Sequence, residues 1–199
     1  MHNEHIIQQA ADCLLGGGVV LLPTDTVYGL AASPLSEEAP RRIFELKSRR
    51  ADVNLPIMVA SGSDLKTLGL DVNPYVQKLL DSPFVPGALT FALGFVTAPL
   101  VPWLQGREEV AIRIPNDETL LAILRKTGPL LVTSANRHGQ STPREVPEIL
   151  AQLNGAPDWI IEDGPRLEVP STLVNCRVLP PAIERVGMIP AEEILQLLQ

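Results

Sequence analysis

Short apolar runs of strand length recur along this chain between segments with helical periodicity, and this alternation constrains the fold more than any other feature. The run V-V-L-L at 19–22 is short, continuous and β-branched at its start, which is typical of a strand buried on both faces. Before it, apolar residues at helical spacing predict a helix from Glu4 to Leu14 that stops at Gly16–Gly18. The chain therefore begins with a helix followed by a buried strand.

The same order continues to the end of the sequence. Ser36 is a plausible cap for a helix that reaches Ser48, with Pro40 still in its first turn. Further patterns predict strands at 55–60, 110–115, 129–134, 158–161, 171–176 and 178–184, and helices at 117–127, 144–153 and 190–198. Alternating strands and helices, followed by consecutive strands, predict a single α/β domain over 1–199 with a mixed, twisted sheet flanked by helices.

Composition excludes several classes of protein. A net charge of −7 disfavours a protein that blankets the phosphates of duplex nucleic acid, although five basic residues cluster at 41–50. No apolar run approaches the ~18 residues of a membrane span, so we expect a cytoplasmic protein without membrane contact. Cys13 and Cys176 lack the spacing of a zinc or redox site, and we expect two buried thiols and no metal held by the protein.

The stretch P-T-D-T-V-Y-G-L at 23–30 follows the buried strand and is rich in polar side chains. Ligands gather at the carboxyl ends of strands in open α/β sheets, which makes this position a candidate site. If the stretch is extended, Thr24, Thr26 and Tyr28 share one side and Asp25 lies on the other. The alternative is a turn in which the hydroxyls bond their own backbone.

Two sets of basic residues have both a structural and a functional interpretation. Lys47, Arg49 and Arg50 end the second helix, where cations complement the helix dipole, but they could also clamp phosphates. In the strand V-A-I-R-I-P, Arg113 shares a face with Ala111 and points away from the core. It is either solvated or a ligand for a carboxylate.

T-S-A-N at 133–136 ends a second apolar strand with polar side chains, either as turn chemistry or as part of a shared site. The chain has no P-loop, dinucleotide-binding glycine motif, zincin motif or nucleophile elbow, so any nucleotide would be held in an unusual way.

Taken together, these segments resemble the YrdC-like family, whose members include bacterial threonylcarbamoyl-AMP synthases. The resemblance runs along nearly the whole chain and is carried by P-T-D-T-V-Y-G-L, I-F-E-L-K-S-R at 43–49, P-G-A-L-T at 86–90, V-A-I-R-I-P, T-S-A-N, P-S-T-L-V at 170–174 and E-R-V-G near 184. It implies a YrdC/RibB-like fold with a large electropositive cleft. The length of 199 residues is similar to the short bacterial type.

The activity implied by the resemblance is synthesis of an adenylate from L-threonine, bicarbonate and ATP, with release of pyrophosphate. Mg²⁺ would accompany ATP without a dedicated protein site, and the product would pass to threonylcarbamoyl-transfer proteins that modify tRNA, with a weak tRNA contact as a further expectation. The resemblance makes Lys47 and Arg49 the catalytic pair. It assigns ATP to Lys47, Arg49, Ser134, Asn136, Thr142 and Arg185, and threonine to Thr26, Arg113, Val132 and Ser171.

Several residues depart from the family pattern. Ser48 stands where a glycine is usual within K-x-R, and Arg50 and Asn54 replace prolines. Met58 stands where some relatives have histidine, and Ala88 and Val186 also replace prolines.

Other functions remain open at this level. A paralogue that binds nucleotide or RNA without synthase activity would keep the fold, and a ribosome-associated RNA-binding module would use the basic cluster at 41–50. Carbamoyl transfer in metal-centre maturation is a third alternative, but there the domain is embedded in a much longer chain.

Overall fold

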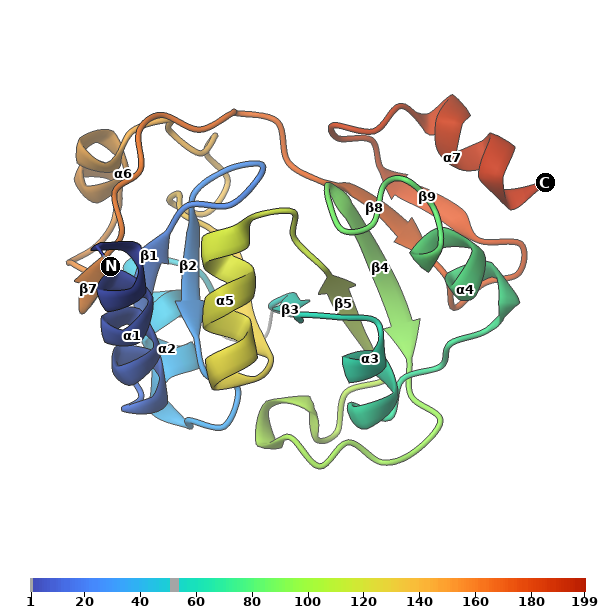
Figure 1. Ribbon diagram of the computed structural model, residues 1–199, viewed down its shortest axis with the longest axis horizontal. Helices are drawn as coiled ribbons and strands as arrows, with labels where there is room; N and C mark the ends of the chain where they lie inside the picture. The colour runs from blue at the N-terminus through green and yellow to red at the C-terminus, as the bar shows by residue number, and fades with distance from the viewer. Residues whose placement is uncertain (1, 51–53) are drawn as a thin grey trace.

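The computed structural model describes residues 2–50 and 54–199. In this part of the chain, nine strands form one sheet in the order β7-β1-β2-β6-β3-β5-β4-β8-β9 (Figure 1). The strands are β1 (Val20–Leu22), β2 (Gly29–Ala32), β3 (Ile57–Met58), β4 (Leu89–Gly94), β5 (Glu109–Arg113), β6 (Leu130–Ser134), β7 (Trp159–Ile160), β8 (Thr172–Asn175) and β9 (Ala182–Arg185). The helices are α1 (His2–Leu15), α2 (Glu38–Leu46), α3 (Ser63–Thr67), α4 (Pro74–Leu80), α5 (Glu118–Thr127), α6 (Val146–Gln152) and α7 (Ala191–Leu198), with a 3-10 turn η1 (Pro102–Leu104).

The sheet is mixed, as the sequence predicts. β1–β7, β3–β5 and β4–β8 pair in parallel, whereas β1–β2, β2–β6, β3–β6, β4–β5 and β8–β9 pair antiparallel. β6 lies between β2 and β3, so the segments around 30, 57 and 132 become neighbours although they are far apart in the sequence.

Helices cover both faces of the sheet. α1 and α5 lie together on one face, in front of β1 and β2 in Figure 1, where Leu14 and Ile123 pack in the same cluster as Val20. On the opposite face, Ile43 of α2 packs in the same cluster as Leu21 of β1. Alternate residues of β1 thus enter different clusters, which confirms the prediction of a strand buried on both faces.

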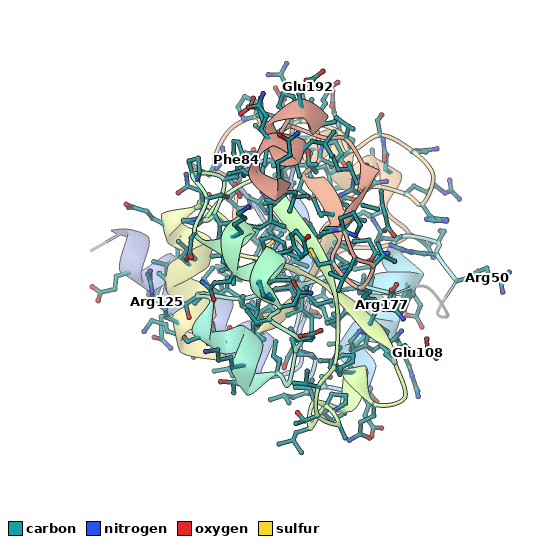
Figure 2. The ribbon with its side chains drawn as sticks, turned by 90° about the vertical axis from the view of Figure 1, so that its right-hand side faces the viewer. Arg50, Phe84, Glu108, Arg125, Arg177 and Glu192 are labelled. Carbon is teal, nitrogen blue, oxygen red and sulfur yellow. The ribbon has the colours of Figure 1, made fainter. Side chains whose placement is uncertain are left out.

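At the far end of the sheet, α4 and α7 lie against β4, β8 and β9 (Figure 1). Phe91 and Leu93 of β4 point into that core, whereas Thr90 and Ala92 face a cavity. Charged side chains such as Glu108, Arg125 and Glu192 lie at the outside of the molecule (Figure 2). At this end of the sheet, one face of β4 thus packs against the core and the other faces the cavity.

The sequence patterns locate most of these elements within a few residues but miss β2, β4, α3 and α4. β2 reads G-L-A-A, which has low strand propensity and no alternation. It is extended because β1 and β6 pair with it on both sides. Tertiary pairing overrides the local preference at this position.

Among the described residues, no helix is long and apolar enough to cross a membrane. Cys13 and Cys176 are both free thiols. Cys176 is buried as expected, whereas Cys13 is only half-buried.

Candidate functional site: a polar cavity on the open face of the sheet

A cavity of about 380 Å³ lies between the C-terminal strands and the segment that follows β1. Its walls come from β2, β3, β4, β5, β6, β8 and β9, from the turn at 24–28 and from the residues after α2. Segments from nearly the whole length of the chain therefore meet around one hollow.

Strand register aligns one wall of the cavity. Arg113 of β5 lies opposite Thr90 of β4, Thr90 lies opposite Leu173 of β8, and Leu173 lies opposite Arg185 of β9. Neighbouring strands are about 4.8 Å apart, so the two arginines stand roughly 14 Å apart along this row. The row therefore has a cation at each end and a hydroxyl between them.

The stretch after β1 is a turn and not an extended segment. The Thr24 hydroxyl donates to the Val27 carbonyl oxygen over 2.7 Å and accepts from the Thr26 amide over 3.0 Å. The two threonine Oγ1 atoms are 3.1 Å apart. The turn interpretation of the sequence is therefore confirmed, and Thr24, Thr26 and Tyr28 nevertheless all line the cavity.

The glycine that follows this turn, Gly29, is required by a close approach of two strands. A Cβ atom at Gly29 would lie 2.7 Å from Cγ1 of Val132, which belongs to the adjacent β6. Gly29 pairs directly with Ser134, so the same close approach brings the T-S-A-N segment beside the turn. A larger residue would push these two walls of the cavity apart.

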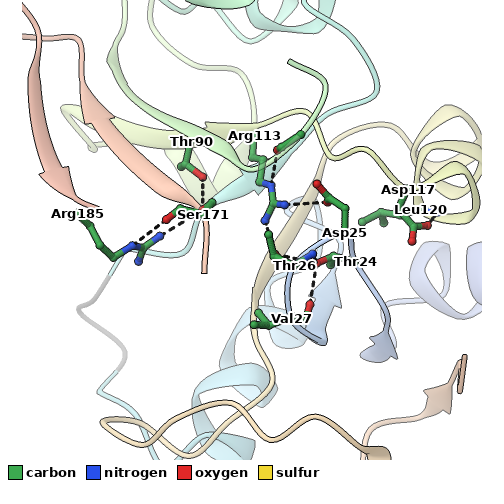
Figure 3. A network of polar contacts seen from close by, with 11 residues as sticks. Thr24, Asp25, Thr26, Val27, Thr90, Arg113, Asp117, Leu120, Ser171 and Arg185 are labelled. Carbon is green, nitrogen blue, oxygen red and sulfur yellow. Dashed lines mark hydrogen bonds and ion pairs between the residues drawn. The ribbon is translucent and has the colours of Figure 1, made fainter. Parts of the chain in front are cut away.

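Three hydrogen bonds hold the Arg113 side chain in the cavity wall (Figure 3). Its Nε donates to the Gly87 carbonyl oxygen over 2.9 Å, Nη1 donates to Thr26 Oγ1 over 2.8 Å, and Nη2 donates to Asp25 Oδ1 over 2.8 Å. The residue is 5% exposed, so its interpretation as a solvated side chain is wrong. Burial lowers the pKa of Arg113, and the Asp25 carboxylate opposes that effect.

The opposite end of the row holds a second hydrogen-bonded group. Thr90 Oγ1 and Ser171 Oγ are 2.7 Å apart, and Arg185 donates to the Ser171 carbonyl oxygen from Nε over 3.1 Å and to its hydroxyl from Nη2 over 3.3 Å (Figure 3). Burial lowers the pKa of the Arg185 guanidinium. A Cβ at Gly187 would lie 2.2 Å from the Pro170 carbonyl oxygen, so a glycine is required where this loop packs beside Ser171.

The K-S-R segment at 47–49 is the C-terminal cap of α2. The Arg49 amide donates to the Phe44 carbonyl oxygen over 2.9 Å and the Ser48 amide donates to that of Glu45 over 3.1 Å, which is the Schellman pattern. Ser48 has φ of 49°, in the left-handed region. This conformation explains why glycine is usual at that position, and it sends Lys47 and Arg49 in different directions.

Lys47 points into the protein. It is 1% exposed, and its ammonium donates to the Ser134 carbonyl oxygen, to the Asn136 carbonyl oxygen over 2.9 Å and to Asn136 Oδ1 over 3.3 Å. Thr142 Oγ1 also donates to Asn136 Oδ1, over 3.2 Å. Burial, and secondly the charge of Arg49, lower the pKa of Lys47 to about 7. Hydrogen bonds of this lysine therefore connect the end of α2 to the T-S-A-N loop.

The ten residues assigned from the resemblance gather at this site in two layers. Those that line the cavity are Thr26, Arg49, Arg113, Val132, Ser134, Ser171 and Arg185. Within the part of the chain that the structure describes, Lys47, Asn136 and Thr142 form the network behind the Ser134 wall and are not lining residues.

Two further residues belong to the site although the sequence patterns did not single them out. Asp25 and Thr26 both accept hydrogen bonds from Arg113 because the segment turns. In an extended segment, the side chains of Asp25 and Thr26 would point to opposite sides. The sequence patterns did not identify Thr90 because they did not predict its strand, β4. The alternation in L-T-F-A-L-G, with Leu89, Phe91 and Leu93 buried, was the signal that could have revealed it.

The basic segment at 41–50 does not form one surface. Arg42 pairs with Asp158, Lys47 is buried and Arg49 lines the cavity. This dispersal removes the main support for a simple RNA-binding module.

Two of the departures from the family pattern, Asn54 and Met58, line the same cavity. The Asn54 carbonyl oxygen accepts from Arg49 Nη2 over 3.4 Å, and the Asn54 side-chain oxygen accepts from Arg107. Met58 lies beside Arg113 in the sheet.

The carboxylates of the cavity region are already engaged by the protein. Asp25 pairs with Arg113, Glu109 with Arg177, and Glu184 accepts from Asn175 over 2.7 Å. The described residues contain no group of three or more His, Cys, Asp or Glu side chains suited to hold a metal ion. A divalent ion at this site would thus take its ligands from a bound phosphate group and from water.

Comparisons with known proteins agree with this architecture. The family model Sua5/YciO/YrdC, described as "Telomere recombination", matches residues 12–187. The threonylcarbamoyl-AMP synthase of Bacillus subtilis (strain 168) is 36% identical over 195 residues, which are 96% of this chain and 56% of that protein. The chain thus spans little more than half the length of this relative.

Two solved structures are similar along almost the whole chain. Pyrococcus abyssi Sua5 complexed with L-threonine has a TM-score of 0.87 and 34% identity, with 96% of this chain and 56% of that chain covered. Escherichia coli YciO has a TM-score of 0.85 and 26% identity, with 96% and 93% covered. On the evidence of the matched range 12–187 and these likenesses, this chain belongs to the Sua5/YciO/YrdC family.

Proposed function

We propose that this protein is a threonylcarbamoyl-AMP synthase, which makes an adenylate from L-threonine, bicarbonate and ATP and releases pyrophosphate. The observation that carries the proposal is the row of Arg113, Thr90, Leu173 and Arg185 across one cavity that also contains Arg49. Ser171 lies beside this row and contacts Thr90 and Arg185. Such a site offers a buried cation for a carboxylate and further cations for a triphosphate. The similarity to a threonine-bound Sua5 supports the assignment of the amino acid.

In this reaction the threonine amine, after losing its ammonium proton, adds to bicarbonate to give a carbamate and water. A carbamate oxygen then attacks the α-phosphorus of ATP, and the bond from that phosphorus to the bridging oxygen breaks as pyrophosphate leaves. The protein's part is to hold two anions in line and to spread their charge. Arg113 would bind the amino-acid carboxylate, and Arg49 and Arg185 would face the phosphates.

Lys47, Asn136 and Thr142 would act from behind Ser134 by fixing the wall on which the nucleotide rests. Mg²⁺ would arrive with ATP and neutralise part of the triphosphate charge, since the nearby carboxylates are already paired. The product would pass to threonylcarbamoyl-transfer proteins acting on tRNA in the cytoplasm.

The test is to incubate the pure protein with ATP, L-threonine, bicarbonate and Mg²⁺ and to measure pyrophosphate. We expect release that requires both threonine and bicarbonate, and that is nearly lost in Arg113→Ala. Arg125→Ala, which removes an exposed arginine outside this cavity, is the matched control and should keep full activity.

Two results would count against the proposal. Pyrophosphate release that ignores threonine would indicate a different nucleotide chemistry. ATP binding without turnover would favour a nucleotide-binding paralogue. Serine should replace threonine with only about 10- to 200-fold lower efficiency, because one methyl group contributes roughly 1–3 kcal/mol to discrimination.

A further inference from the structure

Asp25 is a nearly buried carboxylate that stands behind the cavity wall. Its side chain is 14% exposed, and it contacts Arg113, whose side chain is 6% exposed (Figure 3). Among the described residues, Asp25 is not one of those that line the cavity, whereas Arg113 is. The ion pair with Arg113 is therefore the side-chain contact through which Asp25 can act on a bound ligand.

The three contacts of Arg113 use three different nitrogen atoms. Gly87 takes the Nε–H, Thr26 takes one N–H of Nη1, and Asp25 takes one N–H of Nη2. A guanidinium has five N–H groups, so one remains on each terminal nitrogen. Two N–H groups of one guanidinium can donate to the two oxygens of a carboxylate.

Each of these contacts restrains the guanidinium differently. The Gly87 and Thr26 oxygens are neutral acceptors, and Asp25 supplies the one anionic partner that the structure gives to Arg113 among the described residues. A charge-assisted hydrogen bond is stronger and more directional than a neutral one. Asp25 is thus the contact that does most to hold the guanidinium plane when no ligand is bound.

We propose that Asp25 is a positioning residue for the amino-acid carboxylate, because it holds the plane of Arg113 so that the two unused N–H groups of that side chain face the cavity. The inference rests on the proposed function, since it presumes that an amino acid occupies this end of the row. On this proposal Asp25 binds no substrate itself, but it sets the affinity of Arg113 for the substrate carboxylate.

The test compares two ligands that differ only in the carboxylate. Calorimetric titration with L-threonine and with L-threonine amide gives the ratio of the two dissociation constants. In the wild-type protein this ratio should favour threonine by about tenfold or more, as expected for charge-assisted hydrogen bonds to a buried arginine. Asp25→Ala should reduce the ratio to below about threefold. Asp25→Asn, whose side-chain oxygen still accepts from Nη2 but carries no charge, should give a ratio between those of Asp25→Ala and the wild type.

The kinetic result should follow the same pattern. In Asp25→Ala the KM for threonine should rise about tenfold or more, while the KM for ATP stays within about twofold. Asp81→Ala is the matched control, because Asp81 accepts a hydrogen bond from Gln77 on α4 and lies outside the cavity. It should behave as the wild type in both assays.

A purely structural ion pair would give a different outcome. Asp25→Ala would then weaken the binding of threonine and of threonine amide equally. That result would overturn the inference while leaving the proposed function intact. A wild-type protein that does not distinguish the two ligands would overturn both. If Asp25→Ala does not fold, Asp25→Glu and Asp25→Asn carry the comparison: the longer carboxylate displaces the guanidinium and should lower the ratio more than the neutral amide does.

Discussion

The ammonium nitrogen of Lys47 lies 2.9 Å from the carbonyl oxygen of Asn136. Lys47 itself is only 1% exposed to solvent. Two positions further on, Arg49 lines the cavity. The cap at Ser48 separates them, so the two basic residues of one short motif have different physical roles. One supports a wall of the site from inside, and the other faces the ligand.

This difference predicts different results for two alanine substitutions. Lys47→Ala removes a donor from three oxygens, of which Ser134 O and Asn136 Oδ1 keep a second donor, and it opens a cavity. It should therefore lower the free energy of unfolding by about 3 kcal/mol. Arg49→Ala should change stability by less than about 1 kcal/mol but should reduce pyrophosphate release on the order of 10³-fold. Urea unfolding combined with the pyrophosphate assay measures both, and equal stability of the two variants would contradict the assignment.

The lowered pKa of Lys47 predicts a pH dependence of stability. Because the folded-state pKa is about 7 and the unfolded value is 10.5, the unfolded chain binds more protons between these values. The burial penalty of the ammonium is therefore fully present below pH 7 and is relieved as the pH rises toward 10.5. Relative to Lys47→Met, the wild type should gain stability over this window, by at most about 1.4 kcal/mol per pH unit. Parallel urea titrations at pH 7 to 9.5 measure the difference, and identical slopes would mean that Lys47 keeps its ordinary pKa.

The left-handed backbone at Ser48 predicts a stabilising substitution. A non-glycine residue in this conformation costs about 1–2 kcal/mol, and glycine avoids that cost at an entropic expense of about 0.5–1 kcal/mol. Ser48→Gly should therefore raise the free energy of unfolding by about 0.5–1 kcal/mol. Ser48→Ala, which keeps the strain, serves as the control and should leave the denaturation midpoint nearly unchanged.

The close approach of β2 to β6 predicts a pair of compensating substitutions. Gly29→Ala places a methyl group against Val132 and should cost about 1–3 kcal/mol of stability. Val132→Ala in the same chain removes the obstructing Cγ1 and should restore part of that loss. Chemical denaturation of the two single variants and the double variant gives the coupling energy, and strictly additive effects would argue against this contact.

The sequence alone determined the elements whose apolar pattern matches their own geometry. V-V-L-L at 19–22 is a buried strand, and α1 and α5 follow their helical spacing, because each of these segments carries its periodicity locally. The division of β5 into an apolar face and the face of Arg113 was also predicted from alternation.

The tertiary structure decided the features that depend on contacts between distant segments. G-L-A-A is a strand because β1 and β6 pair with it, and Asp25 meets Arg113, 88 positions away, because the sheet order brings their segments together. Lys47 is buried because the T-S-A-N loop supplies its acceptors. Local propensity carries no information about such partners, since their energy comes from groups that only the folded topology places within hydrogen-bonding distance.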